Sequence, residues 1–326
     1  MDFQIIEDAI RSCPVLPDPE DSRDFDFEKI AGAEPVMRLP QQFSLRFRQT
    51  PVKDQGLRGT CTAFASIGAS EYFNSEEIGQ TLDLSEEFLF KKTKEIDIAD
   101  YGYRGYGAHL RSAAKALQKF GVCFENTLPY SPDEKENFWE EVIVTKNIEA
   151  EAFIYRMQGY ASVSPGLESI KKALVSTNSP LLGAIMLYKS YRGARTTGVL
   201  PVPFEGEEQI GGHALLIIGY DDNSNVLICK NSWGEGWGDK GYLHIPYSCL
   251  KHMYSFWSFV DFVDEELRKK FLIEQHRKMI PAEWGQEALD AWDEGLKAGI
   301  LTHNSKPMDP VTKLEYIMLQ KRQKLL

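Results

Sequence analysis

The order of hydrophobic patterns along the chain constrains its fold more than any other feature. In the first half, apolar residues at helical spacing predict three helices, over residues 61–73, over 86–94 after the N-cap candidate Ser85, and over 110–121. In the second half, apolar runs bounded by turn residues predict four strands, over 181–188, 213–220, 226–230 and 241–246. Helices followed by strands are typical of an α+β protein. We therefore expect a helical and a β-rich sub-domain with a cleft between them.

The composition excludes several classes of function. The chain has 326 residues, 43% of them hydrophobic, as in ordinary globular proteins. Its 37 basic against 48 acidic residues, a net charge of −11, argue against nucleic acid as a partner. No run reaches the ~18 apolar residues of a membrane span, and the acidic start lacks the basic region of a signal peptide. We expect a protein that is cytoplasmic as synthesised, with leaderless export or use by a phage as alternatives.

Both ends differ from the central region, residues 39–263. Residues 1–38 form an acidic leader, and Pro14, Pro17 and Pro19 keep part of it from being helical. This leader is either a solvated linker or a short pro-segment that crosses the cleft, and its acids are expected to keep it on the surface. Residues 264–326 carry helical patterns and are expected to form a C-terminal helical appendage.

Five residues are placed to support chemistry by a thiol. Cys61 begins the first expected helix, where the helix dipole and amides favour a thiolate. Gln55 can fold back so that its amide joins the Cys61 N–H around one oxygen, as an oxyanion requires. His213 begins one expected strand and Asn231 ends the next, so adjacent strands can bring the Asn231 amide to the imidazole. Trp233 can shield that contact from water.

These residues resemble the papain-like cysteine peptidases. Gln55, Cys61, His213 and Asn231 occur in the order of that family, and Asn231 opens the characteristic run 231–234 (Asn-Ser-Trp-Gly). The resemblance covers about residues 38–263 and suggests a bacterial or phage type. It implies a papain-like α+β fold, with a helical left sub-domain, a β-barrel-like right sub-domain and the active site in the cleft. It also implies a cysteine endopeptidase that acts on peptides or proteins through an acyl-enzyme, without cofactor.

The resemblance extends to other positions and departs at some. Gly107, Ala108 and Gly212 are expected to contact the substrate backbone. Arg58 stands where relatives have a disulfide cysteine, so we expect a reduced protein, and its charge could favour the Cys61 thiolate. None of the five cysteines forms a CxxC pair, and no metal-ligand spacing is present.

Three other functions use the same residues. The chain could be a peptide-maturation enzyme or transpeptidase, or a catalytically inactive peptide-binding module. It could also be a peptidoglycan-directed lysin, because Trp292 and residues 309–315 are weakly similar to an S-layer-homology motif that would contact a cell-wall polymer.

Overall fold

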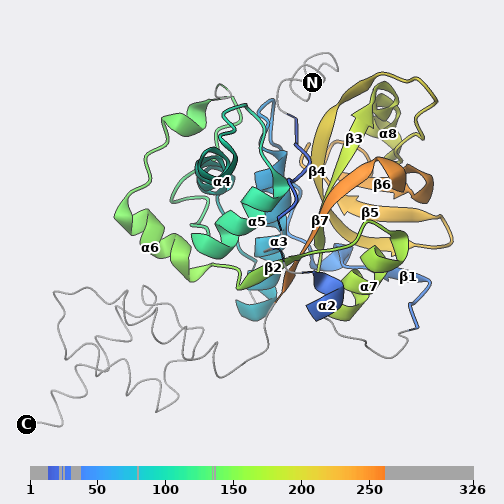
Figure 1. Cartoon of the computed structure of the whole chain (residues 1–326), viewed down its shortest axis with the longest axis horizontal. Coiled ribbons are helices and arrows are strands. Elements are labelled where there is room, and N and C mark those ends of the chain that lie inside the picture. The colour runs from blue at the N-terminus through green and yellow to red at the C-terminus, as the bar shows by residue number, and fades with distance from the viewer. Residues whose placement is uncertain are drawn as a thin grey trace, which may run out of the picture. The chain divides into compact units, whose positions relative to one another are not determined.

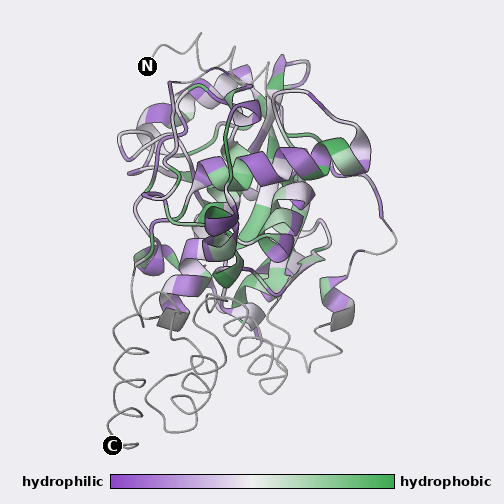
Figure 2. Cartoon of the chain, turned by 90° about the vertical axis from the view of Figure 1, so that its left-hand side faces the viewer, coloured by the Kyte–Doolittle hydropathy of each residue, from purple (hydrophilic) through white to green (hydrophobic). Residues whose placement is uncertain are grey.

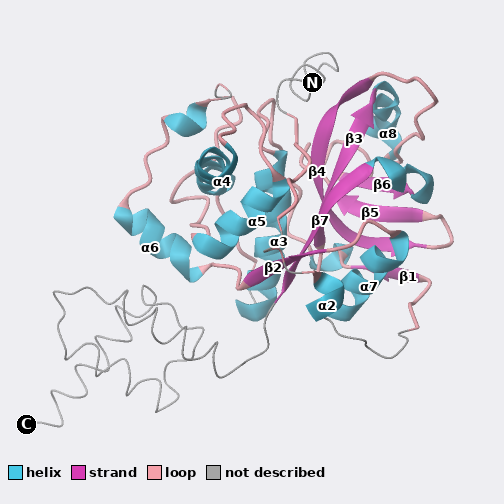
Figure 3. Cartoon of the chain, in the orientation of Figure 1, coloured by secondary structure: helices cyan, strands magenta, loops and turns pink. Residues whose placement is uncertain are grey.

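A computed structural model describes residues 14–21, 24, 26–30, 38–78, 81–133, 135 and 137–260. Most of the helices gather on one side of this region and most of the strands on the other, where a few further helices flank the sheet (Figure 1; Figure 3). We call these groups the helical lobe and the β lobe. No helix in the described ranges is long and apolar enough to cross a membrane. The expected C-terminal appendage, with its S-layer-like motif, and Cys13 lie outside the described residues.

The helical lobe contains the helices that the apolar spacing predicts. Its helices are α3 (Cys61–Ile78), α4 (Glu86–Tyr101), α5 (Leu110–Lys119), α6 (Lys146–Ile154) and the 3₁₀ helix η2 (Phe138–Glu140). The prediction of Ser85 as N-cap of α4 is confirmed, because its side chain accepts a hydrogen bond from the Phe88 N–H. The helix ends at Gly102, which has a φ of 68° that a residue with a side chain rarely adopts.

The β lobe is built on one antiparallel sheet. Its strands are β1 (Gln42–Ser44), β2 (Gly159–Ser162), β3 (Leu181–Tyr188), β4 (Gln209–Asp221), β5 (Val226–Lys230), β6 (Tyr242–Pro246) and β7 (Met253–Val260). The order is β2-β7-β3-β4-β5-β6, and β1 pairs with β4. The four predicted strands are confirmed, whereas β1, β2 and β7 were not predicted. Strand β7 lies between β2 and β3, and its residues do not alternate cleanly between apolar and polar.

The remaining elements are short or flank the sheet. They are α2 (Phe27–Ile30), α7 (Leu167–Thr177), α8 (Ala194–Thr197), η1 (Arg46–Arg48), η3 (Lys189–Gly193) and η4 (Tyr247–His252).

Strand β4 joins the cores of the two lobes. Ala214, Leu216 and Ile218 belong to the core cluster that also holds the buried residues of α3, α4 and α5. Leu215 and Ile217, which point to the opposite face, belong to the cluster under α7. Hydrophobic residues are concentrated in the inner helices and strands (Figure 2). The catalytic histidine predicted from sequence therefore lies on the strand that both lobes share.

Candidate active site

The start of α3 brings Cys61 against the strand that carries His213. The backbone N–H of Ala214, the residue after His213, donates a hydrogen bond to the Cys61 Sγ at 3.5 Å. Both predicted reacting residues are buried, with 3% of Cys61 and 2% of His213 exposed. The thiol and the imidazole thus share one enclosed site.

Antiparallel pairing of β4 with β5 brings Asn231 to the imidazole, as the sequence predicts. The His213 Nε2 and the Asn231 Oδ1 are 2.8 Å apart. Because the amide oxygen can only accept, Nε2 carries the proton and Nδ1 is left as an acceptor. The Trp233 ring stacks on the imidazole, with centroids 4.5 Å apart and planes at 28°. Trp237 and Tyr191 hold the indole by edge contacts.

The enclosure of His213 shifts the protonation of its imidazole. Burial lowers the pKa of His213 to about 4, although the hydrogen bond that its Nε2 donates to Asn231 acts in the opposite direction. The imidazole is therefore neutral near pH 7 in this enclosed state. A neutral imidazole suits a general base that takes the proton of Cys61.

The other described cysteines are poor nucleophiles. Burial raises the pKa of the Cys123 thiol to about 12 and also raises the pKa of Cys229 and of Cys249. All three are free thiols. They stay protonated at physiological pH, and their reactivity is correspondingly low.

The Gln55 side chain is held by contacts on both ends of its amide. Its Oε1 accepts a hydrogen bond from the Ser232 Oγ at 2.5 Å, and its Nε2 donates to the Arg58 carbonyl at 2.7 Å. An amide nitrogen has two hydrogens, so a second donor remains for a substrate oxygen. Ser232 was missed as a site residue, although it follows Asn231 directly in the motif that carries the family resemblance.

Arg58 has a different role from the one expected. Its guanidinium is 1% exposed and forms two hydrogen bonds with the Glu87 carboxylate, at 2.5 and 2.9 Å. A third hydrogen bond reaches the Ser131 carbonyl at 2.9 Å. The positive charge is thus neutralised by Glu87, and the expected support for a Cys61 thiolate is wrong. Arg58 instead ties the loop before Cys61 to α4.

The three predicted substrate-binding positions lie in different surroundings. The Gly107 carbonyl accepts a hydrogen bond from the Lys94 ammonium at 2.7 Å, and Ala108 is fully buried in the helical lobe. This carbonyl is therefore already bonded within the protein. At Gly212, a Cβ atom would lie 2.1 Å from the Tyr254 hydroxyl and 2.3 Å from the Val15 carbonyl oxygen. Only glycine fits there beside an extended chain.

That extended chain is the leader. The Val15 N–H donates to the Gly212 carbonyl at 3.2 Å, and Leu16 forms a parallel β-bridge with His109, next to Ala108. The prediction that the prolines keep this stretch from being helical is confirmed. The expectation that the leader stays on the surface is wrong for Val15, which is 2% exposed and belongs to a hydrophobic core.

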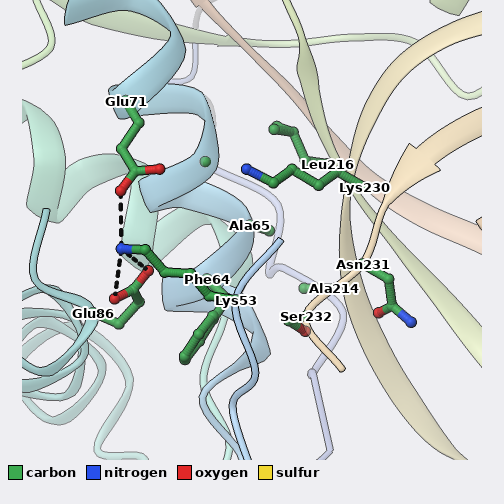
Figure 4. Close-up of a pocket in the computed structure, with 11 residues that line it drawn as sticks. Lys53, Phe64, Ala65, Glu71, Glu86, Ala214, Leu216, Lys230, Asn231 and Ser232 are labelled. Carbon is green, nitrogen blue, oxygen red and sulfur yellow. Dashed lines mark hydrogen bonds and ion pairs between the residues drawn. The ribbon is translucent and has the colours of Figure 1, made fainter. Parts of the chain in front are cut away.

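A cluster of buried charges lies behind the site and was missed from sequence. The Lys53 ammonium is 2.9 Å from Glu71 and 3.0 Å from Glu86 (Figure 4). Burial raises the pKa of Glu86 to about 8 and lowers that of Lys230 to about 8. These residues line a cavity of about 20 Å³ that also meets Asn231, Ser232 and Ala214. The members come from distant segments, so no local sequence pattern indicates them.

No group of His, Cys, Asp and Glu side chains suited to a metal occurs within the described ranges.

The site and fold agree with comparisons to known proteins. The sequence profile of the papain family cysteine proteases matches residues 39–253. A peptidase C1-like protein of Acanthamoeba polyphaga mimivirus is 26% identical over 82% of this chain and 83% of its own length. A cathepsin L-like protein of Caenorhabditis elegans is 30% identical over 62% of this chain and 57% of its own.

Solved structures show the same likeness. Xylellain, a cysteine protease from Xylella fastidiosa, aligns with a TM-score of 0.65 at 27% identity, over 77% of this chain and 97% of that one. Digestive procathepsin L 3 of Tenebrio molitor has a TM-score of 0.58 at 21% identity, over 79% and 78% of the two chains, and so shares the fold.

The α+β fold and these relatives define a thiol-dependent hydrolase. The chain belongs to the papain family of cysteine proteases.

Proposed function

We propose that the protein is a cysteine endopeptidase whose reaction is carried out by Cys61, His213, Asn231 and Gln55. The observation that carries this proposal is the hydrogen bond of 2.8 Å between His213 and Asn231. His213 lies on β4, and the next residue of that strand, Ala214, contacts the Cys61 sulfur. The hydrogen bond to Asn231 leaves the His213 Nδ1 available to accept the proton of the thiol.

The reaction follows from these positions. The Cys61 sulfur attacks the carbonyl carbon of the scissile peptide bond, and its proton passes to His213. The Cys61 backbone N–H and the second Gln55 amide hydrogen stabilise the oxyanion. The carbon–nitrogen bond then breaks as His213 gives its proton to the leaving amine, which leaves a thioester on Cys61. Water, deprotonated by His213, hydrolyses the thioester and releases the carboxylate product.

Residues 1–38 act in this proposal as an inhibitory segment. The leader bonds to Gly212, where a substrate backbone was expected, and to His109, which follows the expected position Ala108, while Cys61 is almost fully buried. A substrate must displace these contacts to reach the sulfur. The leader thus competes with substrate, and its removal or displacement activates the enzyme.

Two measurements test the catalytic assignment. Iodoacetamide should label Cys61 before Cys123, Cys229 or Cys249, as mapped by mass spectrometry, because burial raises the pKa of the other three. Labelling of any of them before Cys61 would refute the assignment.

Gln55→Ala should lower kcat on a fluorogenic peptide by roughly 10²–10³-fold, the usual effect of losing an oxyanion donor. Gln118→Ala, at a partly exposed position on α5 where the amide bonds to the Gln158 carbonyl, is the matched control and should leave kcat unchanged. An unchanged kcat in Gln55→Ala would remove that residue from the mechanism.

The alternative functions are separated by the products. If an added amine is incorporated into the product, as seen by mass spectrometry, the enzyme is a transpeptidase and not a hydrolase. If Cys61 of the wild type reacts with iodoacetamide but no peptide is cleaved, the protein is a binding module.

A further inference from the structure

The leader's Asp18 occupies a site built from both lobes. Its Oδ1 accepts a hydrogen bond from the Arg111 backbone N–H at 3.0 Å, and its Oδ2 accepts one from the Trp257 Nε1 at 2.7 Å. The Asp18 backbone N–H donates to the Ser255 Oγ at 3.2 Å. Arg111 lies in the first turn of α5 and the other two lie on β7, so the carboxylate joins a helix start to a strand.

Strand β7 is shaped for this contact. Ser255 has a φ of 56°, an uncommon value for a residue with a side chain. The pairing of β7 with β3 shifts register at this point, between Leu182 and Ala184. At this irregularity, successive side chains no longer point to alternate faces of the sheet. Ser255 and Trp257 both bond to Asp18 of the leader at this point.

The side chain of Arg111 depends on the leader for its acidic partners. Its guanidinium is 2.7 Å from an oxygen of Asp21 and 2.8 Å from an oxygen of Asp24, and only 6% of the side chain is exposed. It also donates hydrogen bonds to neutral partners, the Tyr101 hydroxyl at 2.9 Å and Tyr160. Displacement of the leader therefore leaves the Arg111 cation without a carboxylate partner, a state that favours a new anion.

The site also lies at a defined distance from the reacting residues. Val15 bonds to Gly212, which precedes His213, and Asp18 is three residues further along an extended segment. At about 3.3 Å per residue, Asp18 lies on the order of 10 Å from that contact. A substrate that replaces the leader would place a side chain in the same position.

We propose that Arg111, Trp257 and Ser255 form a subsite for an acidic side chain of the peptide substrate, which Asp18 fills until the leader is displaced. This inference rests on the proposed peptidase function. It assigns the substrate class as peptides with an Asp or Glu about three residues from the residue that contacts Gly212. The leader is then held by the same interaction that selects the substrate.

The test uses the full chain with a weakened leader, the D18N/D21N/D24N variant. Two acetylated peptides with the sequence of residues 14–21 serve as probes, one unchanged and one with Asp18→Asn. Fluorescence anisotropy should show the unchanged peptide binding about 10- to 100-fold more tightly, as expected when hydrogen bonds to a charged group are lost. Quenched peptide substrates that differ only in Asp or Asn at that spacing should show a preference for Asp of similar size in kcat/KM.

Two further variants identify the subsite. Arg111→Gln and Trp257→Phe, each in the leader-weakened chain, should abolish or reduce the preference for Asp. Lys172→Gln, which removes an exposed pair with Glu168 on α7, is the control and should leave both the preference for Asp and the hydrolysis of a neutral peptide unchanged.

Equal binding of the two probe peptides would overturn the proposal. If both the triple variant and the single Asp21→Asn variant fail to fold, the proposal is also overturned, because the leader would then be a permanent part of the fold. A chain that binds the acidic peptide selectively but hydrolyses nothing would contradict the peptidase function while supporting the acidic subsite.

Discussion

Two arginines with almost fully buried side chains neutralise their charges in different ways. Arg58 pairs with Glu87, a residue of α4 in the helical lobe. Arg111 pairs with Asp21 and Asp24, both in the leader. The first pair joins two parts of the peptidase domain, whereas the second joins that domain to a segment that precedes the family match, which begins at residue 39.

The two arginines differ in whether their acidic partners can be displaced. Glu87 is held within a regular helix and is 1% exposed, so it cannot leave without unfolding α4. Neither Asp21 nor Asp24 lies in a helix, and their side chains are 14% and 15% exposed. The Arg58 pair is therefore a structural contact, and the Arg111 pairs are contacts that a substrate or solvent can replace.

The largest effect should come from breaking the Arg58 pair. Arg58→Met leaves Glu87 buried without a partner and should lower the free energy of unfolding by about 3–5 kcal/mol. Chemical denaturation measures this loss, and the double variant Arg58→Met/Glu87→Leu should recover most of it. If Arg111→Met proves equally destabilising, the two arginines do not differ as described.

The free energy of unfolding at acidic pH should depend on the protonation of His213. Its pKa is about 4 in the folded protein against an ordinary value of 6.5, so the unfolded state takes up a proton first as the pH falls. This group's contribution is fully present above pH 6.5 and is lost as the pH falls towards 4, which removes about 3 kcal/mol. Denaturation between these pH values should give a steeper loss for the wild type than for His213→Gln. Equal slopes would contradict a lowered pKa at His213 in the folded protein.

The smallest effect on stability should come from the leader carboxylates. Asp21→Asn/Asp24→Asn should change the free energy of unfolding by less than ~1 kcal/mol, because Arg111 gains water when the leader moves away. The same variant should raise kcat/KM on small peptides severalfold. Lys172→Gln on α7, which removes an exposed pair with Glu168, is the control for a change of surface charge. A strongly destabilised leader variant with unchanged activity would show that the Arg111 pairs are structural like the Arg58 pair.

Much of the fold could be predicted from local patterns. Apolar spacing indicated α3, α4, α5 and the strands β3 to β6, since each buries one face or one stripe against a core. Strand β7 was missed because its pattern is not regular. The four positions proposed as catalytic could be picked out because short motifs accompany them, and the structure places Asn231 beside His213 as expected.

Other features had no local signal. Ser232 orients Gln55 across 177 positions of sequence, and Trp257 reaches Asp18 across 239. The charge of Arg58 could be read from the sequence, but the presence of Glu87 opposite it could not. The sequence therefore favoured a thiolate role for Arg58 that the pairing removes.

By itself, the sequence determined the helices α3 to α5 and the strands β3 to β6, the order of Gln55, Cys61, His213 and Asn231, and the non-helical character of the proline-rich part of the leader, because these depend on neighbouring residues and backbone restrictions. The tertiary structure decided which groups lost water and which partners replaced it. Burial lowers the pKa of His213, and the leader's carboxylates pair with Arg111, because segments distant in sequence are brought together. Charges in such places are governed by their final neighbours, and those neighbours exist only in the folded chain.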